Sequence, residues 1–347
     1  MDYAYVLLVM KDEQYALGAI ACAYSLKLTK TKYDIVCMVT EDISKDIINI
    51  LEKVMNRVII VPYLTAATSS LKTNKQTSYY SNWQDISFTK WNCLNLTEYK
   101  KVLFVDADKI ILQNLDHLFE LDTPAGTFSS THSEYYLNRG IRDPYYSLTH
   151  GMKVSDSMID FGLYGNNYHN SFVVIGTNIL LSPDKDVYKH VNTLLQQYNK
   201  NNPFGFKCYS MTDEQFITYL YYKYLPFKTG NKYIWTYISQ KHNWICWKYN
   251  WLRKNETPPT VVHFFGIKPW ILKRHEWLDL EVWWKFVKKM ISDIYSNDDN
   301  IIKLYRKEEL ELNPLKGCFY CKVAQKKWDD HDFLNDDCII QCKFYLS

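Results

Sequence analysis

Residues 101–112 read Lys-Val-Leu-Phe-Val-Asp-Ala-Asp-Lys-Ile-Ile-Leu. The apolar run 102–105 predicts a buried strand, and two carboxylates one residue apart, Asp106 and Asp108, follow it directly. An unpaired carboxylate beside a core is costly to desolvate, and a divalent cation would remove that cost. Carboxylate oxygens suit Mg²⁺ and Mn²⁺, which keep open positions for substrate phosphates. The stretch therefore predicts a strand that ends at a metal–diphosphate site.

Strands and helices alternate on the N-terminal side of this stretch. The patterns predict strands at 3–10, 34–39 and 58–61, and helices at 13–27, 44–55 and 88–96. This alternation predicts an α/β fold, a Rossmann-like and mostly parallel sheet with helices on both faces. Ligands of such sheets bind beyond the carboxyl ends of the strands, which is where the two aspartates lie.

The second half of the chain has a looser pattern. Residues 131–170 are rich in Gly, Asn, Tyr and His, and we interpret them as an insertion or lid. Residues 276–294 predict a helix whose Trp283 face is either an interface or core. We therefore expect a catalytic domain at 1–275 and a mostly helical, Cys-bearing C-terminal extension at 276–347.

Composition limits the class of protein. The 347 residues are 47% apolar, which allows a sizeable core, and the net charge of +3 is too small to argue for a nucleic-acid partner. The sequence shows no secretory signal and no apolar run long enough to span a membrane. We therefore expect a cytoplasmic protein whose cysteines are mostly reduced.

A second informative run covers residues 261–270, which read Val-Val-His-Phe-Phe-Gly-Ile-Lys-Pro-Trp. His263, at the end of a predicted buried strand, is either a metal ligand or a core histidine. Gly266 permits close approach of the backbone, and Lys268 supplies a point charge suited to phosphate. A histidine, a glycine and a lysine in one tight turn favour a cradle for a metal and a diphosphate.

Together the two runs resemble the two signature motifs of glycosyltransferase family 8, in its glycogenin-like branch. Residues 88–120 resemble the family's block around Asp-x-Asp, and residues 5–26 resemble its opening strand and helix, with Tyr15 before the pair Gly18 and Ala19. Residues 212–215, Thr-Asp-Glu-Gln, resemble its acid-Gln motif. The resemblance covers about residues 3–275.

The resemblance implies a GT-A fold and a metal-dependent, retaining transfer of a hexose. The implied donor is a UDP-sugar, with glucose the first expectation, and the acceptor is a protein, a glycan or a small molecule. The implied cation is Mn²⁺, with Mg²⁺ as the alternative, held by Asp106, Asp108 and His263. The implied donor-binding residues are Leu8, Val9, Met10, Tyr15, Lys90, Asp106, Ala107, Asp108, Gly266 and Lys268, and the implied catalytic residues are Lys90, Asp213, Glu214 and Gln215.

Two departures from the family pattern leave alternatives open. Ile175-Gly176-Thr177 stands where the family usually has Asn-Ser/Ala-Gly, a motif that shapes the sugar pocket. The segment in which glycogenin carries its own acceptor tyrosine does not align, although Tyr233, Tyr237 and Tyr249 are present. The alternatives are a self-glucosylating primer and a catalytically idle protein that binds a nucleotide-sugar or glycan. The resemblance also makes a homodimer an expectation.

The C-terminal segment carries two cysteine pairs, Cys318 with Cys321 and Cys338 with Cys342. Two such pairs near this spacing are able to hold a structural Zn²⁺ with tetrahedral geometry. Ordinary reduced cysteines are the alternative interpretation.

Overall fold

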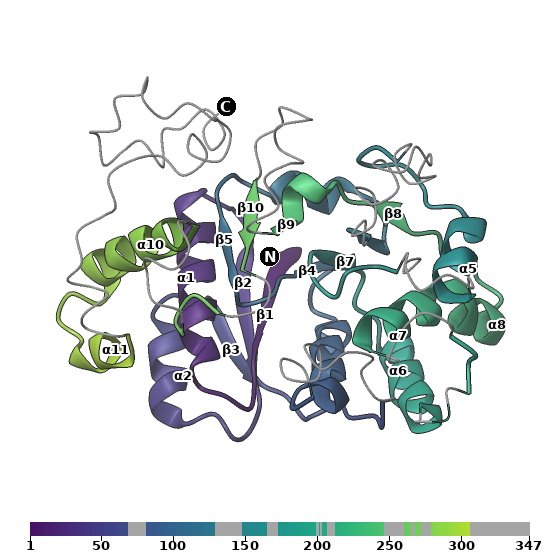
Figure 1. The fold of residues 1–347 in the computed structure, drawn as a ribbon, viewed down its shortest axis with the longest axis horizontal. Helices are drawn as coiled ribbons and strands as arrows, with labels where there is room; N and C mark the ends of the chain where they lie inside the picture. The colour runs from purple at the N-terminus through teal and green to yellow at the C-terminus, as the bar shows by residue number, and fades with distance from the viewer. Residues whose placement is uncertain are drawn as a thin grey trace, which may run out of the picture. The chain divides into compact units, whose positions relative to one another are not determined.

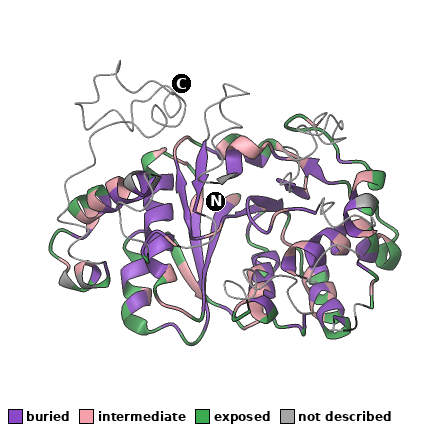
Figure 2. Ribbon diagram, in the orientation of Figure 1, coloured by how far each residue is buried: buried purple, intermediate pink, exposed green. Residues whose placement is uncertain are grey.

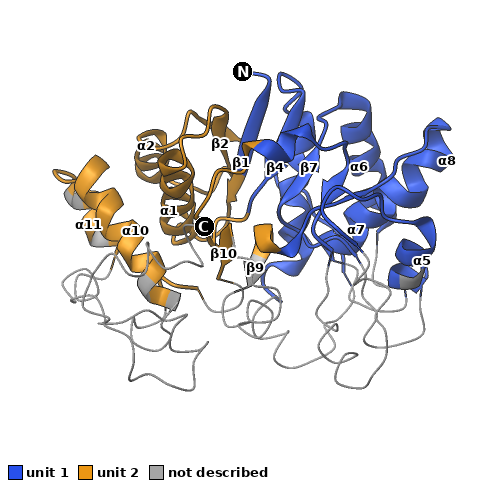
Figure 3. Cartoon of the chain, turned by 90° about the horizontal axis from the view of Figure 1, so that it is seen from above, with its two compact units in different colours: residues 1–6, 61–105, 117–240 blue, residues 7–60, 106–116, 241–347 orange. Residues whose placement is uncertain are grey.

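The computed structural model describes residues 1–68, 81–128, 148–164, 173–198, 201, 203–206, 212–245, 260–264, 268–271 and 279–305. The chain forms two compact units, each assembled from three segments (Figure 3). Unit 1 comprises Met1–Val6, Val61–Val105 and His117–Gln240, and unit 2 comprises Leu7–Ile60, Asp106–Asp116 and Lys241–Ser347. The chain thus passes into unit 2 at Asp106, at the first of the two predicted ligands. The division at residue 275 stays a prediction.

In unit 2, strands β3 (Arg57–Ile60) and β2 (Asp34–Val39) run parallel and continue to β1 (Tyr3–Val9), which both units share (Figure 1). Helix α1 (Tyr15–Leu28) is buried along almost its whole length. Helix α2 (Lys45–Glu52) buries Ile47, Ile50 and Leu51, the spacing of one helix face. Alternating strands and helices therefore form this unit as predicted.

Unit 2 also contains a three-stranded sheet in the order β5 (Lys109–Ile111), β10 (Val261–His263) and β9 (Trp244–Ile245). Strand β10 runs antiparallel to β5, with His263 opposite Lys109. This register places His263, from the second sequence motif, opposite the residue that follows Asp108.

Helix α10 (Asp279–Ile294) packs against α1 and is followed by α11 (Asp299–Leu304). The indoles of Trp283 and Trp284 are fully buried. Just after the helix, the Tyr295 hydroxyl donates to the carbonyl of Ile50 at 2.9 Å. The Trp-bearing face of this helix is therefore core, which decides between the two alternatives that the sequence left open.

In unit 1, β4 (Lys101–Phe104) runs parallel to β1 and antiparallel to β7 (Ile179–Leu181). The sheet continues through β6 (Ala125–Gly126) to β8 (Thr236–Tyr237), and its strands are largely buried (Figure 2). The other elements that lie wholly or partly in this unit are η1 (Gln84–Asn95), η2 (Asp116–Glu120), α5 (Asp156–Tyr164), α6 (Lys185–Gln197), α7 (Asp213–Tyr219), the π-helix Leu220–Tyr224, α8 (Leu225–Thr229) and η5 (Gln240–Asn243).

The predicted fold class is confirmed, with differences of detail. The predicted helix at 88–96 is the 3₁₀ run η1, and the predicted insertion at 131–170 contains a helix, α5. Helix α6 begins after Asp184, whose carboxylate accepts from the amides of Asp186 and Val187. Asp184 is thus the N-cap of α6. Among the described residues, no helix combines the length and apolar character needed to cross a bilayer.

Candidate metal centre

Three potential metal ligands converge within unit 2. Asp106 and Asp108 follow β4 along the chain, and His263 ends β10; one ligand atom from each lies within 4.8 Å of the others. The antiparallel pairing of β5 with β10 sets this arrangement, and the amide of Phe264 donates to the carbonyl of Asp108 at 2.9 Å. The structure therefore brings together the three residues that the resemblance named for the cation.

Asp108 is the central group of this cluster. Its side chain is buried, with Oδ1 at 3.2 Å from Nε2 of His263 and Oδ2 accepting a hydrogen bond from Nζ of Lys268. Burial alone would raise the pKa of Asp108, but the charge of Lys268 and the contact with His263 outweigh it and hold the pKa far below its usual range. Asp108 is thus ionised throughout the physiological pH range.

His263 and Lys268 respond in opposite ways to the same surroundings. Burial lowers the pKa of His263 and outweighs the attraction of Asp108, so the imidazole is neutral at pH 7. Burial would also lower the pKa of Lys268, but Asp108 overcomes it and the pKa is raised. The site therefore holds two carboxylates, a neutral imidazole and a permanent positive charge.

This set of groups fits a hard divalent cation. Two carboxylates and a neutral imidazole offer the oxygen and nitrogen ligands that Mg²⁺ and Mn²⁺ accept. Bonds of roughly 2.1 Å at right angles place neighbouring ligand atoms about 3 Å apart. The separation of 3.2 Å between the Asp108 carboxylate and the His263 imidazole matches that spacing.

Three aromatic residues, Tyr15, Trp270 and Trp283, pack beside the cluster. The Lys268 ammonium lies 5.9 Å from the ring centroid of Tyr15, and Tyr15 meets Trp270 edge-on at 5.2 Å. Trp270 packs in turn on Trp283 of α10 at 5.5 Å. Burial raises the pKa of Tyr15 to about 12, so its hydroxyl stays protonated. Tyr15, one of the expected donor-binding residues, is therefore held beside Lys268, the lysine expected to bind phosphate.

Gly18, within α1, has no side chain, and this leaves space for the Asp-x-Asp turn. A Cβ at this position would lie 2.6 Å from the carbonyl oxygen of Ala107 and 2.6 Å from the ring of Trp270. Real Cβ atoms do not approach backbone oxygens so closely. The glycine therefore lets both halves of the candidate centre pack on one turn of α1.

We expect Gly18→Ala to lower both stability and cation affinity. In an exposed helix interior the same change stabilises by about 1 kcal/mol, because alanine is the better helix former. Here the added methyl has to displace the Ala107 carbonyl, which connects Asp106 and Asp108. Thermal unfolding with and without Mn²⁺ measures both effects. A rise in the unfolding temperature, with an unchanged shift on adding Mn²⁺, would contradict this role of Gly18.

The expected catalytic residues lie in unit 1. Nζ of Lys90 is 2.8 Å from Oδ2 of Asp213 and donates to the carbonyl of Gly176 at 2.9 Å. The amide of Gly176 donates to Oε1 of Glu214 at 2.9 Å. The side-chain oxygen of Gln215 accepts from the amide of Thr212 at 3.0 Å and so completes a capping box for α7. The structure groups Lys90, Asp213 and Glu214 around one glycine.

Other expected site residues divide between described and undescribed parts of the chain. Leu8 and Met10 are buried at the end of β1 and just beyond it, in unit 2. Gly266, Tyr249 and the four cysteines proposed for zinc lie outside the described residues. Cys22, Cys37 and Cys93 are buried and free, as expected of core cysteines.

Sequence reasoning missed one buried charge next to the centre. Lys109, which follows Asp108 on β5, is fully buried, and its ammonium donates to Oδ1 of Asn243 at 2.8 Å. The signal was a lysine at the head of the apolar run 109–112, where a core residue is expected. A buried cation is costly unless it is paired, and this pair supplies a partner.

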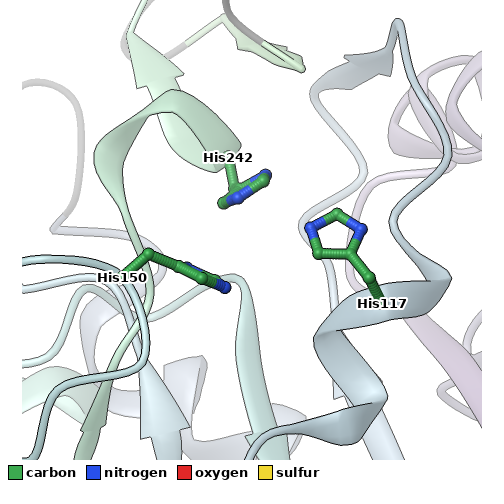
Figure 4. Close-up of side chains that lie close together, drawn as sticks. All are labelled: His117, His150 and His242. Atoms are coloured by element: carbon green, nitrogen blue, oxygen red, sulfur yellow. The ribbon is translucent and has the colours of Figure 1, made fainter.

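Three further histidines, His117, His150 and His242, belong to neither sequence motif (Figure 4). His117 and His150 belong to unit 1, with ring centroids 6.1 Å apart. His242 belongs to unit 2, where its Nδ1 lies 2.7 Å from the hydroxyl of Thr260. We therefore assign the candidate metal centre to Asp106, Asp108 and His263, all of which belong to one unit.

Residues 6–148 match the family model described as glycosyl transferase family 8. The matched segment is less than half of the chain. The chain is 30% identical over 134 residues to the uncharacterized protein R707 of Acanthamoeba polyphaga mimivirus, an alignment that covers 39% of this chain and 46% of R707. It is 34% identical over 119 residues to human glycogenin-1, which covers 34% of this chain and 33% of glycogenin-1. The chain thus spans less than half the length of these curated relatives.

A solved structure supports the fold over a longer part of the chain. An active-site mutant of LgtC superposes with a TM-score of 0.50 and 14% sequence identity, covering 82% of this chain and 95% of that one. A similarity at this identity shows the fold. The chain therefore has the GT-A architecture that the resemblance implied.

Proposed function

We propose that this chain is a metal-dependent, retaining glycosyltransferase that moves a hexose from a UDP-sugar to a protein, glycan or small-molecule acceptor. Glucose is the donor sugar that the likeness to glycogenin-1 favours. The observation that carries the proposal is the buried carboxylate of Asp108, which has the His263 imidazole on one oxygen and the Lys268 ammonium on the other. Such a group suits a cation and a phosphate side by side.

The roles of the residues of unit 2 follow from their charges. A cation bound by Asp106, Asp108 and His263 would neutralise charge on the leaving nucleoside diphosphate. Lys268 supplies a compact positive charge for the phosphate oxygens. The Tyr15 ring offers a flat face to the uracil. Leu8 and Val9 end β1, and Met10 follows them, a few residues before Tyr15 begins α1.

The residues of unit 1 supply the proposed sugar-binding part. Lys90, Asp213 and Glu214 form a partly buried polar group around Gly176, and the charges of this group suit the hydroxyls of a hexose. Gln215 supports this group by capping α7, the helix that carries Asp213 and Glu214. The homodimer and the cytoplasmic location stay predictions.

A panel of UDP-sugars tests the proposal, with UDP release and thermal unfolding measured in parallel. We expect UDP-glucose to give UDP release with Mn²⁺, a smaller rate with Mg²⁺ and none with EDTA. UDP with Mn²⁺ should raise the unfolding temperature. At a hundredfold excess over Kd, the bound ligand raises the free energy of unfolding by about 2.7 kcal/mol. Stabilisation without UDP release for any donor would identify a binding protein. The absence of both stabilisation and UDP release would contradict the proposal. Intact mass after the UDP-glucose reaction tests for self-glucosylation.

A further inference from the structure

Both backbone polar groups of Gly176 are hydrogen-bonded within unit 1. Its amide donates to Glu214, and its carbonyl accepts from Lys90, each at 2.9 Å. The amide of Thr177 donates to the carbonyl of Ile175 at 2.6 Å, which closes a three-residue turn centred on Gly176. Both polar groups of this one glycine are thus bonded to charged side chains.

One face of α7 supplies half of this arrangement. Glu214 and Thr218 are four residues apart, so they lie on the same side of the helix. Glu214 accepts from the amide of Gly176, and the hydroxyl of Thr218 accepts from the amide of Val174 at 3.1 Å. The segment that leads into β7 is therefore docked along α7 by two hydrogen bonds of matched spacing.

The other half of the arrangement requires that residue 176 has no side chain. A Cβ on Gly176 would lie 2.6 Å from Oδ2 of Asp213 and 3.0 Å from Nζ of Lys90. These are the two atoms of the ion pair, which stand 2.8 Å apart. An alanine at 176 would therefore push into the ion pair itself.

We propose that Gly176 is a positioning residue: the space left by its missing side chain lets Asp213 and Lys90 close over its peptide, which fixes the Lys90 ammonium where the transferred sugar is handled. This inference rests on the proposed function for the role of Lys90. It also gives a physical reason for the departure from the family pattern at Ile175-Gly176-Thr177. Gly176 acts through Asp213 and Lys90 and touches no substrate itself.

A double-mutant cycle between Gly176→Ala and Asp213→Ala tests the geometry without any activity assay. In the wild-type background, Gly176→Ala should lower the unfolding temperature by roughly 2–4 °C. In the Asp213→Ala background the added methyl has room, so the same change should cost much less. An equal loss in both backgrounds would overturn the proposal, because Gly176 would then act through its own backbone alone.

Gly126→Ala is the matched control for the cycle. A Cβ at Gly126 would lie 2.3 Å from a methyl group of Val174, so this variant also introduces a clash in unit 1, but an apolar one. Its loss of unfolding temperature should be the same with and without Asp213→Ala. If Gly126→Ala and Asp213→Ala are coupled to the same extent, the cycle reports a general loss of stability of unit 1 and no specific contact. That result would contradict the proposal.

Turnover provides the functional readout. Gly176→Ala should lower kcat for UDP release by about tenfold to a hundredfold, because a small misplacement of an aligned group is costly. The affinity for UDP with Mn²⁺ should not change, and Gly176→Ala should cost little further turnover when Asp213 is already alanine. Loss of UDP affinity with unchanged kcat would contradict the proposal. If the wild-type protein lacks transferase activity, the proposed function fails, whereas the thermal cycle still decides whether Gly176 positions the ion pair.

Discussion

Asp108→Asn should lower Mn²⁺-dependent UDP release by about 10²–10³-fold, the usual effect of removing one electrostatic contribution to a transition state. The amide keeps the size of the side chain but removes its charge and one of its two acceptor oxygens. A neutral group between His263 and Lys268 no longer attracts a divalent cation. Release of UDP at saturating Mn²⁺ measures the effect, and circular dichroism shows that the variant is folded.

Asp122→Asn is the control for this prediction. Asp122 also pairs with a lysine, Lys153, but the pair is exposed to solvent and lies in unit 1. Loss of such a surface pair has little effect on stability, so turnover should stay close to the wild-type value. Full turnover of Asp108→Asn, with Mn²⁺ still required, would contradict the role given to Asp108.

Lys268→Met should change the affinities for Mn²⁺ and for UDP in opposite directions. The ammonium of Lys268 contacts Asp108, so its removal takes away a positive charge that competes with the cation. Affinity for Mn²⁺ alone should therefore rise. Affinity for UDP should fall by about tenfold to a hundredfold, because a charge-assisted hydrogen bond contributes roughly 1.5–3 kcal/mol. Calorimetric titrations with Mn²⁺ and with UDP measure the two changes separately.

The stability of Lys268→Met adds a second, independent readout. Without a cation, Asp108 is left as a buried charge that lacks its main partner, so the unfolding temperature should fall. Added Mn²⁺ should restore more stability than it adds to the wild type. Lys53→Met, which removes an exposed ion pair with Asp298, should show neither effect. A fall in Mn²⁺ affinity of the Lys268 variant would contradict the placement of its ammonium beside the cation site.

Local patterns predicted the elements that carry the metal centre. The apolar run before Asp106 forms β4, and the run before His263 forms β10, because buried apolar residues bounded by polar ones favour a strand in a sheet of this kind. The pairing of β5 with β10 joins residues about 150 positions apart, and strand propensity does not reveal such a partner. The resemblance to family 8 supplied that long-range link.

The polar group around Gly176 was harder to predict. The sequence showed Gly176 only as a departure from a family motif, and Gln215 only as part of an acid-Gln pair. In the structure, the Gln215 side chain caps α7. Lys90, Asp213 and Glu214 surround Gly176. These contacts depend on how η1 and α7 approach the turn before β7, which is set by tertiary packing. Composition and periodicity carry no information about such an approach.

A crystal of the protein grown with Mn²⁺ and UDP, measured at the manganese absorption edge, would locate the cation itself. We expect one anomalous peak within coordination distance of the carboxylates of Asp106 and Asp108 and of the His263 imidazole, with Lys268 turned to the UDP phosphates. A manganese peak away from these three side chains, or UDP bound with His263 remote from any ion, would contradict this expectation.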